Sequence, residues 1–153
     1  MFVKLFAVTI FLTFASSPAT AEQCNTREAA LAMMKTVQAE GAAFRAESAR
    51  ATEAFRIQMN EKGAALGWDE EKKSSVFREM KATERFVLLE TQINKMRQDM
   101  LDLNKTVNVS NFQADPAGTC TQIQNIRTLV RQIELKSKDL RILKQSYLAA
   151  VKN

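Results

Sequence analysis

The chain contains no histidine, and this absence narrows the chemistry open to it. Without an imidazole there can be no Ser–His–Asp or Cys–His catalysis, no histidine-ligated zinc and no Glu-x-x-His di-iron site. The sequence also lacks a glycine-rich phosphate loop and a dinucleotide-binding fingerprint. We therefore expect no catalytic residue, no metal ligand and no cofactor, and we predict that the protein is not an enzyme.

Residues that break helices are scarce as well. The 153 residues include four glycines and two prolines. Such poverty in helix breakers favours long helices over sheets. The composition therefore predicts an all-α protein, with a net charge of +5 from 22 basic and 17 acidic side chains.

The N-terminus has the layout of a signal peptide. One lysine precedes an uncharged apolar run, Leu5–Ala15, and Ala19 and Ala21 place small residues at the −3 and −1 positions of a cleavage site. The apolar run is shorter than the stretch of about 20 residues that spans a bilayer. We predict that residues 1–21 are a signal peptide, and that residues 22–153 form a single helical domain that is periplasmic or secreted. A retained N-terminal anchor is the alternative.

The only two cysteines are Cys24 and Cys120. In an exported chain an even pair of cysteines predicts a disulfide. A lipid anchor on Cys24 is disfavoured, because Glu22 and Gln23 stand where a small residue is needed directly before the modified cysteine. A reactive thiol would need a nearby base. We therefore predict an intramolecular Cys24–Cys120 disulfide and no transmembrane segment in the mature chain.

Three segments show the periodicity of amphipathic helices: Asn25 to about Met59, Glu70–Leu103, and Thr119 to the C-terminus. In each, apolar or small residues recur at alternating spacings of three and four, which forms a coiled-coil-like seam. The seams are Ala30, Met34, Val37, Gly41, Phe44, Ser48, Ala51 and Phe55; Phe86, Leu89, Ile93, Met96, Met100 and Leu103; and Ile123, Ile126, Val130, Ile133, Ser137, Leu140, Lys144, Tyr147 and Val151.

The predicted helix ends imply a topology. Asn25, Asp69 and Thr119 are candidate N-caps, and either Gly63 or Gly67 suits the end of the first helix. Short connections make sequential helices antiparallel, so we predict an up-down-up bundle of three long helices. The first and third helices then start at the same end of the bundle, which brings the two cysteines within the roughly 7 Å that a disulfide allows between Cα atoms. The connection between the last two helices includes a stretch, TVNVSNF, that suits an extended conformation.

The first seam is unusually small in its middle, at Gly41, Ser48 and Ala51. Small seam residues let neighbouring backbones approach closely, or leave room for a large side chain or an apolar ligand. Six methionines follow the expected cleavage site. Methionines more often fill an irregular core, but they can also line a groove that holds varied partners.

Four cations of the third helix, Arg127, Arg131, Lys138 and Arg141, share one stripe. Such a stripe can meet an acidic protein, an anionic lipid surface or another polyanion. The simpler alternative is a solvated helix face. We expect no nucleic-acid binding, because no aromatic residues interleave with the cations for base stacking.

These observations favour a passive binding role. We predict a non-catalytic exported interaction protein, accessory or chaperone-like, that binds another envelope or secreted protein through its helix faces. The alternative is a carrier of a small apolar ligand or lipid within the bundle. Self-association is a further expectation, because so slim a bundle buries limited apolar surface.

Overall fold

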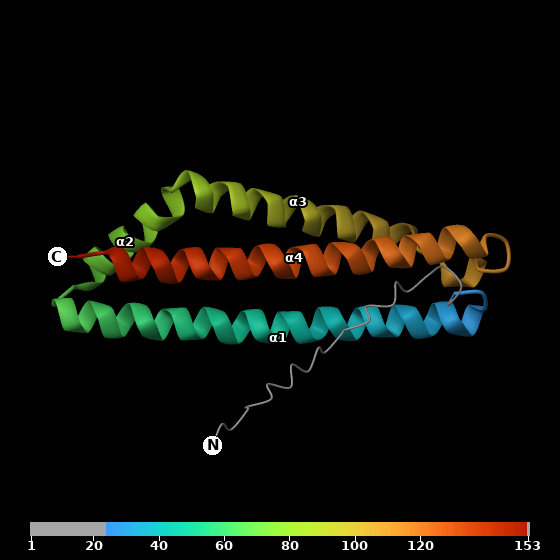
Figure 1. Cartoon of the computed structure of the whole chain (residues 1–153), viewed down its shortest axis with the longest axis horizontal. Helices are drawn as coiled ribbons and strands as arrows, with labels where there is room; N and C mark the ends of the chain where they lie inside the picture. The colour runs from blue at the N-terminus through green and yellow to red at the C-terminus, as the bar shows by residue number, and fades with distance from the viewer. Residues whose placement is uncertain (1–23, 153) are drawn as a thin grey trace, which may run out of the picture.

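The computed structural model describes residues 24–152, and this part of the chain is helical without strands. The all-α prediction is therefore confirmed for these residues, within which no helix combines the length and apolarity needed to cross a membrane. The predicted signal peptide lies outside the described residues. The elements are α1 (Arg27–Leu66), α2 (Glu70–Ala82), α3 (Glu84–Thr106), the 3₁₀ turn η2 (Val109–Asn111) and α4 (Pro116–Ala150) (Figure 1).

The helices are arranged around α4. Figure 1 shows α4 lying between α1 and α3, with α1 and α4 running in one direction and α3 in the other. The main packing contacts join α4 to α3 and α4 to α1, whereas α1 and α3 barely approach each other. The seam of α1 is therefore covered by α4 on one side, while α3 does not close over it.

The ends of α1 follow from local chemistry. The side chain of Thr26 accepts a hydrogen bond from the backbone N–H of Ala29 at 3.1 Å, so the N-cap is Thr26 rather than the predicted Asn25. At the other end Gly67 adopts a left-handed conformation, with φ of 68°, and terminates the helix. The prediction that Gly63 or Gly67 ends the helix is thus resolved in favour of Gly67, while Gly63 lies buried within α1.

The predicted helix over residues 70–103 is in fact two helices, α2 and α3. It begins as expected, since Asp69 accepts from the N–H of Lys72 at 2.7 Å. It breaks at Thr83, whose backbone is extended and whose hydroxyl donates to the carbonyl of Met80 at 2.8 Å. The break allows Met80 and Phe86, on either side of it, both to be buried. A change in the phase of the apolar residues marks this point in the sequence.

The last helix starts earlier than predicted. Asp115 caps it by accepting from the N–H of Gly118 at 2.9 Å, and Pro116 occupies the first turn, where its missing N–H costs nothing. The predicted N-cap, Thr119, is therefore wrong, since the observed N-cap lies four residues earlier. The preceding connection also contains a 3₁₀ turn rather than only extended chain, and the side chain of Asn108 caps this turn by accepting from the N–H of Ser110.

The disulfide prediction is confirmed. Cys24 and Cys120 are joined, with their Cα atoms 5.9 Å apart. Both cysteines are buried, and Phe112 from the α3–α4 connection packs in the same apolar cluster. The disulfide thus joins the start of α1 to the start of α4 at one end of the molecule.

A second apolar cluster holds the opposite end together. Met59 of α1, Val76 of α2 and Leu148 of α4 are buried there, with Trp68 packed against them. The ammonium group of Lys62 on α1 donates to the carbonyls of Leu148 and Ala149, at the C-terminus of α4. Tertiary contacts therefore fix α1 against α4 at both ends of the molecule. Between these ends, α1 and α3 hardly contact each other.

Candidate functional site

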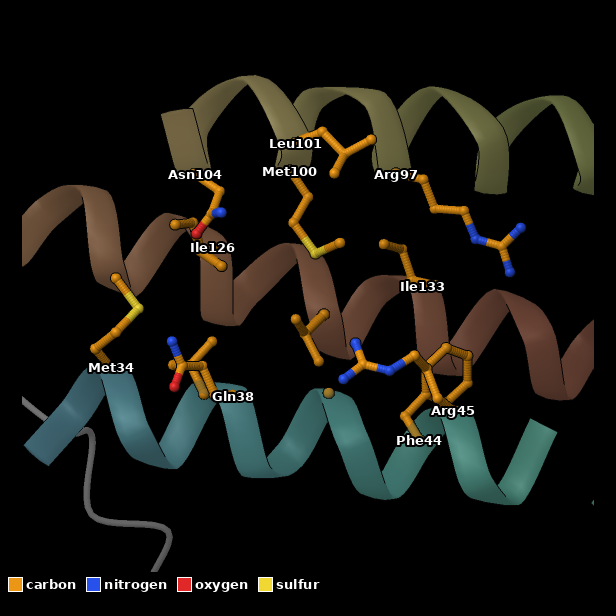
Figure 2. A pocket seen from close by; sticks show the side chains of 13 residues that line it. Met34, Gln38, Phe44, Arg45, Arg97, Met100, Leu101, Asn104, Ile126 and Ile133 are labelled. Carbon is orange, nitrogen blue, oxygen red and sulfur yellow. The ribbon is translucent and has the colours of Figure 1, made fainter. Parts of the chain in front are cut away.

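An apolar hollow lies over α4, between α1 and α3 (Figure 2). Its volume is about 560 Å³, and it is open to solvent on one side. Figure 2 shows Met34 of α1 and Met100 of α3 extending into the space over α4. The lining residues are Met34, Val37, Gln38, Gly41, Phe44 and Arg45 of α1; Arg97, Met100, Leu101 and Asn104 of α3; and Ile126, Val130 and Ile133 of α4.

A second, smaller hollow continues along the same two helices, α1 and α4. Its volume is about 250 Å³, and its wall is more polar than that of the first. We call it the basic hollow, because three of its lining residues are cations. The lining residues are Ser48, Ala51, Thr52, Ala54 and Phe55 of α1; Arg97 of α3; and Ser137, Leu140, Arg141, Lys144 and Gln145 of α4.

The two hollows form one groove. They share Arg97, and on α1 and α4 the residues of the basic hollow follow those of the apolar hollow in the three-four rhythm of the seams. From Met34 to Phe55 the groove is about 30 Å long, at a rise of about 1.5 Å per residue. Buried seam residues therefore form the floor of the groove, and the seam of α1 from Gly41 to Phe55 is only partly buried along its wall.

The small residues of the first seam lie on the wall of this groove. Gly41 lines the apolar hollow, while Ser48 and Ala51 line the basic hollow. A Cβ atom added at Gly41 would meet only the guanidinium of Arg45, at an ordinary contact distance of 3.8 Å. The space beside Gly41 is thus occupied by neither α3 nor α4.

Charge is segregated in the groove. Among the described residues, no aspartate or glutamate lines either hollow. Arg45, Arg97 and Lys144 line the groove and form no ion pair within residues 24–152, whereas Arg141 pairs with Glu47. The groove therefore presents three cations that form no salt bridge with a described carboxylate.

Lys144 is the most enclosed of these cations. Its ammonium group lies 5.8 Å from the ring centroids of both Phe55 and Phe86. Burial lowers the pKa of Lys144, because the charged form loses solvation, and the charge of Glu90 opposes this effect. Cation–π contacts with the two rings compensate part of the lost hydration.

The predicted basic stripe lies between α4 and α1, beside the groove. Arg127 donates to both carboxylate oxygens of Glu40, and Arg131 lies 3.7 Å from the same group. Arg141 pairs with Glu47 at 2.8 Å, and Lys138 pairs with Glu134 on its own helix, also at 2.8 Å. Three of the four cations of the stripe thus pair with α1, Lys138 pairs within α4, and the role of the stripe toward a partner stays a prediction.

The Arg127–Glu40 pair leads to a pH-dependent expectation. The hydrogen bond from Arg127 holds the pKa of Glu40 below its ordinary value, against the opposing effect of burial. The stabilisation is therefore present above the ordinary carboxyl pKa and is lost as the pH falls through the lowered value. We expect Glu40→Gln to cost about 0.5–1 kcal/mol at neutral pH, because solvent screens a pair of this exposure, and to cost nothing at about pH 2.

Urea unfolding of both proteins across this pH range is the measurement. Glu53→Gln is the matched control, since Glu53 pairs with Arg56 on one helix and both side chains are more than half exposed. We expect no measurable loss from the control. A cost at Glu40 that did not change with pH would contradict the ionic origin of the effect.

Comparison with known proteins adds no family. Models of protein families, curated proteins and solved structures were all compared with this chain, and none matches it. Within the described part of the chain, no group of three or more Cys, Asp or Glu side chains is placed to hold a metal ion. The groove is therefore the feature of this molecule that indicates a function.

Sequence reasoning missed the arginines of the groove. Arg45 and Arg97 lie outside the predicted seams. They line the groove because α3 packs against α4 and hardly contacts α1. Lys144 did carry a signal, since it occupies a seam position at which an apolar residue is expected. In the structure this seam cation is half buried against Phe55 of α1 and Phe86 of α3, at the wall of the basic hollow.

Proposed function

We propose that the protein is a non-catalytic exported interaction protein whose groove receives an α-helix of another exported protein. The observation that carries this proposal is the uncovered seam. Seam residues of α1 and α4 line the two hollows at helical spacing for about 30 Å, and those of α1 from Gly41 to Phe55 are only partly buried. A groove walled by three helices has the length and shape to take a fourth helix.

Export is part of the proposal. It is supported by the signal-peptide pattern of residues 1–21 and by the Cys24–Cys120 disulfide, which is typical of oxidising compartments. A periplasmic or secreted partner is therefore expected.

A carrier of a small apolar ligand is the second candidate. It is favoured by the volume of the apolar hollow, about 560 Å³, which lies within the range of small-molecule pockets. Such pockets usually enclose most of the ligand, whereas this hollow is open along one side and continues into a second one. An extended partner fits this shape better than an enclosed small molecule does.

Site-specific photo-crosslinking in the cell that makes the protein tests the proposal. A benzophenone amino acid is placed at Leu101, which is 51% exposed and lines the apolar hollow, or at Leu135, which is 61% exposed and lines neither hollow. We expect the Leu101 probe to form an adduct with a helical segment of one exported protein, and the Leu135 probe to form none.

Gly41→Leu supplies the blocking control. Its Cβ atom fits the observed space, and the rest of the side chain enters the apolar hollow. We expect this substitution to abolish the Leu101 adduct while helicity and unfolding midpoint are maintained. Equal adducts from both probes, adducts with a second copy of this chain, or adducts with lipid alone would each overturn the proposal.

A further inference from the structure

We infer that the partner helix is anionic in the half that lies over the basic hollow, where its carboxylates pair with Lys144 and Arg97, and apolar in the half that fills the apolar hollow. This inference rests on the proposed function and names the chemistry of the partner. It follows from the charge, the burial and the shape of the groove.

The first argument is the sorting of charge. None of the acidic residues within 24–152 lines either hollow. Elsewhere on α1 and α4, cations are paired with carboxylates, as in the Arg127–Glu40 and Arg141–Glu47 pairs. The described lining of the groove thus contains cations and no carboxylates, which is complementary to an anionic ligand.

The second argument is the cost of covering Lys144. Its ammonium group lies 5.8 Å from the centroids of two aromatic rings, and among the described residues only the more distant charge of Glu90 acts on it, without a salt bridge. A helix docked over the basic hollow would remove the water that still reaches this charge. A partner without a carboxylate would leave the lysine buried and unpaired, which is strongly unfavourable, whereas a partner with one would pair it. The groove therefore discriminates against neutral helices as well as favouring acidic ones.

The third argument is the difference between the two ends of the groove. The apolar hollow is floored by Ile126, Val130 and Ile133 and has methionine side chains at its rim, which suits leucine-like residues. In the basic hollow, the ammonium group of Lys144 lies 5.8 Å from the ring centroid of Phe55. Cations line both hollows, but only the apolar hollow has a floor of three aliphatic side chains, and only the basic hollow contains the half-buried Lys144. This difference favours one orientation of a partner helix that has an apolar half and an acidic half.

Two synthetic helical peptides of about 20 residues, the length of the groove, serve as probes. Both carry leucines at seam spacing. One carries glutamates beside the leucines in one half, and the other carries glutamines at the same positions. Binding to the oxidised full-length chain is measured by calorimetry or fluorescence anisotropy, and dodecanoate below its micellar concentration is tested as an acyl probe.

We expect the glutamate peptide to bind about tenfold or more tightly than the glutamine peptide, the effect of losing a charge pair that is largely desolvated. Lys144→Met keeps the length of the side chain and removes its charge, and Arg97→Gln removes the second cation. Each substitution is expected to weaken the glutamate peptide toward the affinity of the glutamine peptide, and to leave the glutamine peptide unchanged or bound more tightly. Lys35→Met, an exposed lysine outside both hollows, is the matched control and should change neither affinity.

The outcomes separate the inference from the proposed function. Equal binding of both peptides, abolished in both cases by Gly41→Leu, overturns the inference and leaves the helix-binding groove in place. Failure of both peptides to bind overturns the proposed function as well, and binding of dodecanoate in that case assigns the groove to an acyl ligand. Loss of the glutamate peptide's advantage in the Lys35→Met control would also overturn the inference, because the effect would then be one of net charge.

Discussion

Reduction of the Cys24–Cys120 disulfide should lower the free energy of unfolding by about 4–5 kcal/mol. The bond closes a loop with a sequence separation of 96, and the closed loop restricts the unfolded chain far more than it restricts the folded one. For a domain whose total stability is of the order of 5–15 kcal/mol, this is a large share. Urea unfolding of the oxidised and reduced forms of the same chain measures the difference directly.

A double Cys24→Ala/Cys120→Ala variant controls for the reductant. Alanine is preferred to serine because both cysteines are buried, and a buried hydroxyl without a partner would add a cost of its own. The variant should unfold near the midpoint of the reduced protein and should not respond to dithiothreitol. Coincident curves for the oxidised and reduced proteins would show that the bond does not stabilise this fold.

The second large effect is expected at Phe86. This residue is among the largest fully buried side chains, with 2% of its surface exposed, and it packs where α3 begins. Replacing it by alanine removes most of an aromatic side chain from the core and leaves a cavity, so we expect Phe86→Ala to cost about 3–5 kcal/mol. The loss of its contact with Lys144 adds to the effect. Equilibrium unfolding in urea is the measurement.

Leu88→Ala is the control on the same helix. Leu88 lies two residues further along α3 and is 55% exposed. Its truncation should change the free energy of unfolding by no more than about 0.5 kcal/mol. If the two substitutions cost the same, the packing of α3 against α4 would differ from the one described here.

Local chemistry determined many features that the sequence alone predicted correctly. Asp69 caps a helix because its carboxylate can accept from a backbone N–H three residues later, and Gly67 ends one because it tolerates a positive φ. The disulfide could be predicted because helices that alternate in direction return the chain to the same end after two reversals. These inferences depend on neighbouring residues or on simple connectivity.

The errors at the helix ends have a common reason. Thr26 and Asp115 were each in competition with another plausible cap nearby, and the sequence does not say which hydrogen bond forms. The break at Thr83 was indicated only by a shift in apolar phase. Its position depends on burying Met80 and Phe86 at once, which is a tertiary requirement.

The sequence by itself predicted a helical chain, which residues 24–152 confirm, and it showed the absence of histidine and the three-four spacing of the apolar residues. These properties follow from residue type and spacing, because a helix has a fixed period. Only the tertiary structure decided that α3 packs on α4 and diverges from α1, and so leaves Gly41, Met100 and Lys144 along an open groove. The physical reason is that the apolar spacing of a helix predicts which of its faces packs against a neighbour. Which helix that neighbour is depends on how the helices are placed in space.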